Sequence, residues 1–121
     1  MQNIVAVAIG GAIGSLCRYG ASLACVRWFA ASTIHATFAV NVIGCFCLGL
    51  FAASSFGRSA LNHAAIAVGL LGGFTTFSTF GLETVRCAQE GAIAAAVGNV
   101  AANILVGLAA VAVGLQLGRA L

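Results

Sequence analysis

Residues 69–83 read GLLGGFTTFSTFGLE and decide how the chain can fold. They place a glycine pair, hydroxyl side chains and phenylalanines in the middle of a chain that is otherwise almost entirely aliphatic. Adjacent glycines weaken a helix, and the hydroxyls of Thr75 and Thr76 can cap a helix that restarts after them. The stretch therefore predicts an apolar helix that is broken near its centre, at Gly72 and Gly73.

The composition places this broken helix in a membrane. Of the 121 residues, 62% are hydrophobic and only 6% are charged, proline is absent, and the mean hydropathy is +1.13. A soluble domain of this size would carry several times more charge to keep its surface hydrated. We therefore expect membrane lipid around the chain and no nucleic-acid partner.

Polar clusters divide the chain into four apolar spans, residues 4–26, 33–53, 64–84 and 92–115. Each is close to the roughly 20 residues that a helix needs to cross the hydrocarbon core. The first span is too long for a signal peptide and is interpreted as retained. The connectors are short, so residues 1–121 are predicted to form a single all-α integral membrane domain with four transmembrane helices.

The basic residues at the two ends of the spans give almost no orientation signal. Arg58 and Arg119 fall on the side of the termini, whereas Arg27 and Arg86 fall on the other side. A chain without a preferred orientation can insert both ways, and four helices are too few to shield a polar pathway from lipid. We expect an antiparallel, dual-topology homodimer.

Asparagines mark one face of the second and fourth spans. Asn41 is the only strongly polar side chain between His35 and Ser54, and Asn99 and Asn103 lie four residues apart. A buried amide needs a hydrogen-bonding partner, which either a neighbouring helix or a hydrated path can supply. Both interpretations stay open for Asn41 alone, but three buried amides together favour a polar stripe.

The third span combines the elements of an ion pathway. A broken helix exposes backbone carbonyl and amide groups at mid-depth, a device that membrane proteins use to hold ions. Phe77 and Phe80 share a helix face, and Ser78, Thr79 and Glu83 lie beside them. The electropositive edge of a phenyl ring can stabilise an anion without trapping it, as conduction requires.

The chain resembles the CrcB/Fluc family of fluoride channels. The motifs are GGFTTFSTF (residues 72–80) followed by Glu83, NVIGCF (residues 41–46) and GGAIGSLCRY (residues 10–19). The resemblance implies a dual-topology dimer in the bacterial inner membrane that passes fluoride passively through two pores and lowers its cytoplasmic toxicity. The implied pore residues are Asn41, Phe77, Phe80, Ser78, Thr79 and Glu83, with Asn103 where relatives often carry a hydroxyl side chain.

The resemblance also implies a structural sodium ion at the dimer axis, which is not transported. Its ligands would be the backbone carbonyls of Gly72 and Thr75, and Arg18 would draw anions toward a vestibule. The fourth span departs from the family pattern, because relatives often present serine and an aromatic hydroxyl where this chain has Asn99 and Asn103.

Three other functions fit parts of the sequence less well than a channel does. A small dual-topology, proton-coupled multidrug exporter needs an acid in its first span, where this chain has Arg18 and no acid. An enzyme would need a base close to a nucleophile, and neither His35 nor His63 lies within a turn of Ser78. A purely structural subunit explains the glycine motifs but not the break with its paired rings. We expect a channel and no enzymatic activity.

Overall fold

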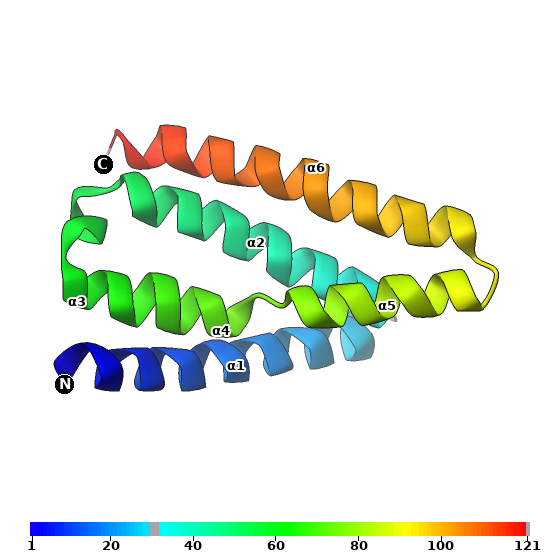
Figure 1. Ribbon diagram of the computed structural model, residues 1–121, viewed down its shortest axis with the longest axis horizontal. Coiled ribbons are helices and arrows are strands. Elements are labelled where there is room, and N and C mark those ends of the chain that lie inside the picture. Colours follow the sequence, from blue (N-terminus) through cyan, green and yellow to red (C-terminus); the bar gives the residue numbers. More distant parts are fainter. Residues whose placement is uncertain (30–31, 121) are drawn as a thin grey trace.

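The computed structural model describes residues 1–29 and 32–120, which form helices joined by short turns (Figure 1). The long helices are α1 (Gln2–Phe29), α2 (Thr33–Ala53), α5 (Phe77–Gln89) and α6 (Ile93–Gly118). Between α2 and α5 lie four short elements: the 3₁₀ turn η1 (Ser55–Arg58), α3 (Ala60–Asn62), the π-helical η2 (His63–Leu71) and α4 (Gly72–Phe74).

Among the described residues, four segments are long and apolar enough to cross a membrane: Gln2–Trp28, Thr33–Ala53, Ala60–Gln89 and Ile93–Gly118. The second has the bounds expected from the sequence, the first and third extend beyond both of their expected ends, and the fourth extends beyond its expected C-terminal end only. Both termini lie at the same end of the molecule, as four crossings require (Figure 1). Large apolar side chains such as Leu16 and Leu105 are 70% and 67% exposed, which suits hydrocarbon and not water.

Glycines bring α1 into backbone contact with the third span. A Cβ atom added at Gly10 would collide with the carbonyl oxygen of Ala65, and one added at Gly14 would collide with that of Leu70. Gly10 and Gly14 form a G-x-x-x-G motif, and it allows the backbones of the two helices to approach closely. Because Arg18 follows Gly14 by four residues, it lies on the same face and reaches the third span.

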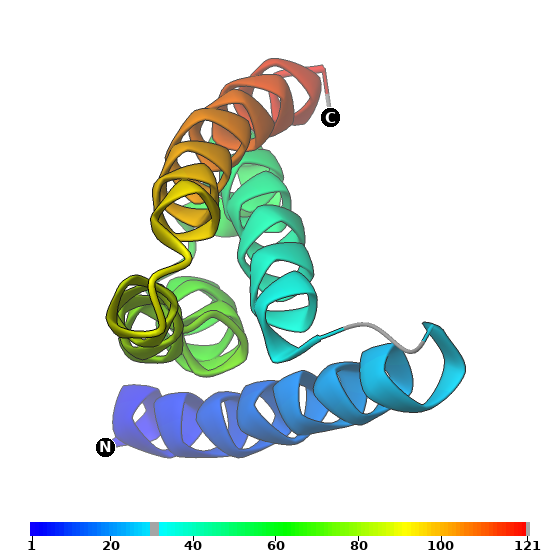
Figure 2. The same cartoon turned by 90° about the vertical axis from the view of Figure 1, so that its right-hand side faces the viewer.

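Helices α2 and α6 pack closely along their second halves. A Cβ atom at Gly49 would meet the carbonyl of Val111, and one at Gly114 would meet that of Phe46. In the view of Figure 2, α2 lies between α6 and α1. This arrangement points the middle of α2, including Asn41, at both the third span and α6.

Helical structure in the third span stops between Phe74 and Phe77 (Figure 1). Thr75 and Thr76, called the extended pair below, have ψ angles of 158° and 111°. The prediction that the helix breaks at Gly72 and Gly73 is wrong. Both residues are helical, and Gly73 packs against the backbone of Gly11. The predicted cap is present, since the Thr76 hydroxyl accepts a hydrogen bond from the Thr79 N–H at 3.2 Å.

Candidate functional site

Side chains from two other helices hold the extended pair. Asn41 on α2 accepts from the Thr76 N–H at 2.9 Å and donates through Nδ2 to the Thr76 carbonyl at 3.2 Å. Arg18 on α1 donates from Nη1 to the Thr75 carbonyl at 3.2 Å. Backbone groups that leave a helix inside a membrane need such partners, because no water is there to replace them. The break is thus stabilised by contacts between helices.

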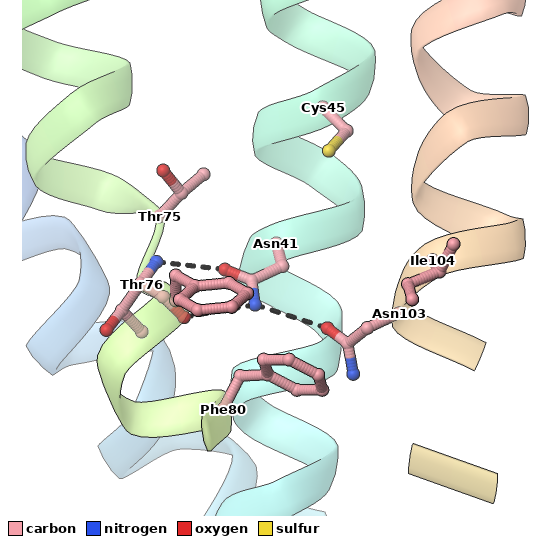
Figure 3. Close-up of a pocket in the computed structure, with 8 residues that line it drawn as sticks. Asn41, Cys45, Thr75, Thr76, Phe80, Asn103 and Ile104 are labelled. Carbon is pink, nitrogen blue, oxygen red and sulfur yellow. Dashed lines mark hydrogen bonds between the residues drawn. The ribbon is translucent and has the colours of Figure 1, made fainter. Parts of the chain in front are cut away.

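A cavity of about 240 Å³, called the aromatic cavity below, opens beside the extended pair (Figure 3). The rings of Phe77 and Phe80 lie with their centroids 5.4 Å apart and their planes at 54°. Phe80 is buried, whereas Phe77 is 81% exposed. The lining residues come from α2, the extended pair, α5 and α6, and they are Asn41, Cys45, Thr75, Thr76, Phe77, Phe80, Asn103 and Ile104.

Asn41, Asn99 and Asn103 form one hydrogen-bonded series, called the amide ladder below. Asn41 Nδ2 donates to Asn103 Oδ1 at 3.2 Å (Figure 3). Asn103 Nδ2 donates to both oxygens of Asn99 at 3.0 Å, and Asn99 Nδ2 donates to the Thr84 hydroxyl at 2.8 Å. The predicted polar stripe is therefore present, and Asn41 also has the interhelical partner that the simpler interpretation required.

A second cavity, called the hydroxyl cavity below, has a volume of about 260 Å³ and lies between α1, α2 and the start of α5. Arg18 is the one charged residue in its lining. The other lining residues all carry hydroxyl groups except Val40, and they are Ser15, Tyr19, Ser22, Thr37, Val40, Thr76 and Thr79. Thr76 lines both cavities. A guanidinium among hydroxyl groups is a setting that favours small anions over cations.

Glu83 is a buried carboxylate, 8% exposed, one turn beyond Thr79. Its Oε1 accepts a hydrogen bond from the Thr37 hydroxyl at 3.1 Å. Its Oε2 has no hydrogen-bond partner among the described residues. A buried carboxylate oxygen left without a partner is costly, so this atom is suited to a water, an ion or a group from another chain.

Most of the predicted pore and vestibule residues line one of the two cavities. Asn41, Phe77, Phe80 and Asn103 line the aromatic cavity, and Arg18 and Thr79 line the hydroxyl cavity. Ser78 lines neither, but its hydroxyl lies 3.3 Å from that of Thr76. Glu83 is connected to the hydroxyl cavity through Thr37.

Several residues that line the two cavities were not predicted as site residues, and Thr76, Thr37 and Cys45 are among them. Thr76 was expected only as a cap, although it joins the two cavities. Thr37 could have been found, because it precedes Asn41 by four residues and so shares its helix face. Cys45, four residues after Asn41, lines the aromatic cavity and could have been found in the same way.

Comparison with known proteins agrees with these motifs. A family model described as CrcB-like protein, Camphor Resistance (CrcB), matches residues 5–115. The chain belongs to the CrcB family.

Three relatives match this chain over nearly their whole length. The chain is 45% identical to the fluoride-specific ion channel FluC of Allorhizobium ampelinum, with 98% of each chain covered. It is 42% identical to the FluC of Paracoccus denitrificans, covering 99% of this chain and 97% of that one. It is 39% identical to the FluC of Chloroflexus aurantiacus, covering 98% of this chain and 97% of that one. Membership of this family and four helices able to cross a membrane make the chain a multi-pass membrane protein.

Proposed function

We propose that the chain forms a fluoride-specific ion channel, which catalyses no reaction and lets fluoride leave the cytoplasm passively. The observation that carries this proposal is the aromatic cavity, which two phenylalanine rings and the Asn41 amide line beside an interruption of a transmembrane helix. The similarity to relatives that are named fluoride-specific ion channels supports the choice of ion.

The chemistry of the aromatic cavity suits a small anion that must bind briefly. Its lining contains no charged side chain. Ring edges and amide N–H groups carry partial positive charge, so they can replace part of the hydration shell of fluoride. Because no full positive charge is present, the anion is also released, as conduction requires. Arg18 in the hydroxyl cavity supplies the attraction from a distance.

We further propose that two oppositely inserted copies form the functional unit and build two pores. Phe77 is 81% exposed in the single chain although it lines the aromatic cavity. A hydrated anion path cannot face lipid, so the open side of this cavity needs a second copy. Crosslinking of single-cysteine variants would show parallel or antiparallel neighbours, and exclusively parallel pairs would contradict the dual topology.

A structural sodium ion at the junction of the two copies is part of the same proposal. Sodium is a hard cation that prefers oxygen ligands, and backbone carbonyls beside the interruption of the third span can supply them. Thr75 fits, because Arg18 uses only one of the two lone pairs of its carbonyl. The Gly72 carbonyl fits as well. In a continuous helix it would accept from the Thr76 N–H, but that N–H donates to Asn41 instead. Two copies would supply four such carbonyls.

A proton-coupled multidrug exporter is the alternative, and the buried Glu83 with its unpartnered Oε2 is the observation that favours it. Such an exporter would move protons and a lipophilic cation in opposite directions across a proteoliposome membrane. A fluoride channel would produce neither flux.

Replacing the rings tests the proposed channel function. Phe77→Ile and Phe80→Ile remove the electropositive ring edges and keep an apolar side chain, so both variants should lose fluoride efflux from proteoliposomes and remain dimers. Phe56→Ile is a suitable control, because Phe56 packs against Phe51 and lines neither cavity. Normal efflux from both ring variants would refute the role of the rings.

A further inference from the structure

The orientation of the Asn41 and Asn103 side-chain amides is fixed by contacts with the protein backbone. Asn41 Oδ1 accepts from the Thr76 N–H, and an N–H group can only donate. At the other end, Asn103 donates to the Asn99 carbonyl, and a carbonyl can only accept. The nitrogen and oxygen positions of Asn41 and Asn103 are therefore not interchangeable.

With this orientation, Asn41 has no free donor. A carboxamide nitrogen carries two hydrogens. Those of Asn41 Nδ2 go to the Thr76 carbonyl and to Asn103 Oδ1, both at 3.2 Å. Those of Asn103 Nδ2 both go to Asn99. An anion that enters the aromatic cavity must therefore displace an existing acceptor before it can bind the Asn41 amide.

The two acceptors of Asn41 Nδ2 differ in how easily they can be displaced. The contact with Thr76 is reciprocal, because the same residue donates its N–H to Asn41 Oδ1, and it holds the extended backbone in place. The contact with Asn103 joins two half-buried side chains on different helices. Asn103 can change rotamer without moving the backbone, so its bond is the one that yields.

We propose that Asn103 Oδ1 is an internal competitor for the fluoride site. In the empty cavity it occupies the Asn41 donor, and fluoride binds there by displacing it. This inference rests on the proposed channel function and deepens it, since it assigns to the fourth helix a role in setting the affinity for the ion. The competing oxygen also keeps the Asn41 amide partnered when no ion is present, which avoids an unsatisfied donor inside the membrane.

The competition has a measurable size. A neutral hydrogen bond in a protein changes an equilibrium constant by roughly threefold to tenfold. When a binding-competent state is only partly populated, the apparent dissociation constant rises by the same factor. Removing the competitor should therefore lower the half-saturating fluoride concentration roughly threefold to tenfold. The ratio of fluoride to chloride permeation should not change, because displacement of Asn103 costs the same whichever anion binds.

The test measures fluoride currents at increasing fluoride concentration for the wild type, Asn103→Leu and Asn103→Ser. Leucine has no acceptor and the serine hydroxyl is too short to reach Asn41, so both variants should show the lower half-saturating concentration. Leu105→Ala, on the same helix with its side chain 67% exposed, serves as the control. An unchanged or higher half-saturating concentration in folded, dimeric Asn103 variants would overturn the inference while leaving the channel function intact. A wild type without fluoride current would instead refute the channel function.

The wild type itself gives a second readout that does not depend on a variant folding. In solid-state NMR of protein with ¹⁵N-labelled asparagine, the Nδ2 resonance of Asn41 should shift on titration with sodium fluoride, and titration with sodium chloride is the control. Assignment rests on the Asn41–Asn103 cross-peak, which should weaken as fluoride saturates the site. Persistence of that cross-peak at saturating fluoride would show that no displacement occurs.

Discussion

Asn41→Asp places a carboxylate where the aromatic cavity now presents an amide donor, with almost no change of shape. The acceptor for the Thr76 N–H is retained. In the wild type, Asn41 Nδ2 donates to the Thr76 carbonyl oxygen and to Asn103 Oδ1, both at 3.2 Å. In the variant, a carboxylate oxygen takes the place of this nitrogen and comes into close contact with both of those oxygens. An anion in the place of Asn103 Oδ1 would be roughly 4 Å or less from the introduced charge. At an effective dielectric constant near 20, this repulsion is about 4 kcal/mol.

A repulsion of that size lowers the occupancy of the site about a thousandfold, since each 1.4 kcal/mol corresponds to a factor of ten. The assay is fluoride efflux from proteoliposomes that contain equal amounts of dimeric protein. Asn62→Asp makes the same chemical change at a residue outside both cavities, where Asn62 Nδ2 donates to the Phe56 carbonyl at 2.9 Å, and it should keep normal efflux. If the folded Asn41→Asp dimer retained more than a tenth of the wild-type rate, fluoride would not pass the Asn41 amide and the reasoning would be wrong.

Three further predictions concern the parts around the cavities. Arg18→Gln should slow fluoride efflux and make its rate less sensitive to ionic strength. Arg18→Lys should keep that sensitivity because the positive charge remains. Equal salt dependence of efflux in both variants would count against attraction by Arg18. Gly14→Ala should destabilise the protein by roughly 1–3 kcal/mol, because its Cβ would meet the backbone of Leu70 and Phe74, and the thermal midpoint should fall. Gly20→Ala is the matched control, since nothing lies within 4 Å of a Cβ there. Replacing sodium by N-methyl-D-glucamine should lower the thermal midpoint of the dimer if the Gly72 and Thr75 carbonyls hold a sodium ion, and a midpoint independent of sodium would argue against that site.

Periodicity and composition predict the four apolar helices because each span is bounded by polar residues. Ser32 and Ser54 flank the second span, and α2 begins and ends beside them. The stripe formed by Asn99 and Asn103 was also predictable, because residues four apart lie on one helix face. These features depend on neighbours within one segment of the chain.

The position of the break was not predictable in the same way. Local propensity pointed to Gly72 and Gly73, but their backbone is helical, and Gly73 permits close approach to Gly11. The interruption occurs where Asn41, 35 positions earlier in the chain, binds the Thr76 N–H and carbonyl. A contact between distant segments overrides local propensity, and one sequence does not reveal such a contact.

The direction of the amide ladder was equally hidden. The sequence places three asparagines in the membrane, but which oxygen accepts from which nitrogen depends on backbone groups of Thr76 and Asn99. The hydrogen-bond partner of Glu83 could not be predicted from the sequence either, because Thr37 approaches it from another helix. Helix faces can be derived from the sequence, whereas the pairing of those faces requires the structure.

The most direct measurement is efflux of fluoride from proteoliposomes that contain the purified wild-type protein, with chloride efflux measured in parallel. We expect rapid, passive fluoride efflux that needs no proton gradient, and chloride efflux no faster than from protein-free liposomes. Liposomes that retain fluoride in the presence of folded, dimeric protein, or that release chloride as readily as fluoride, would contradict it.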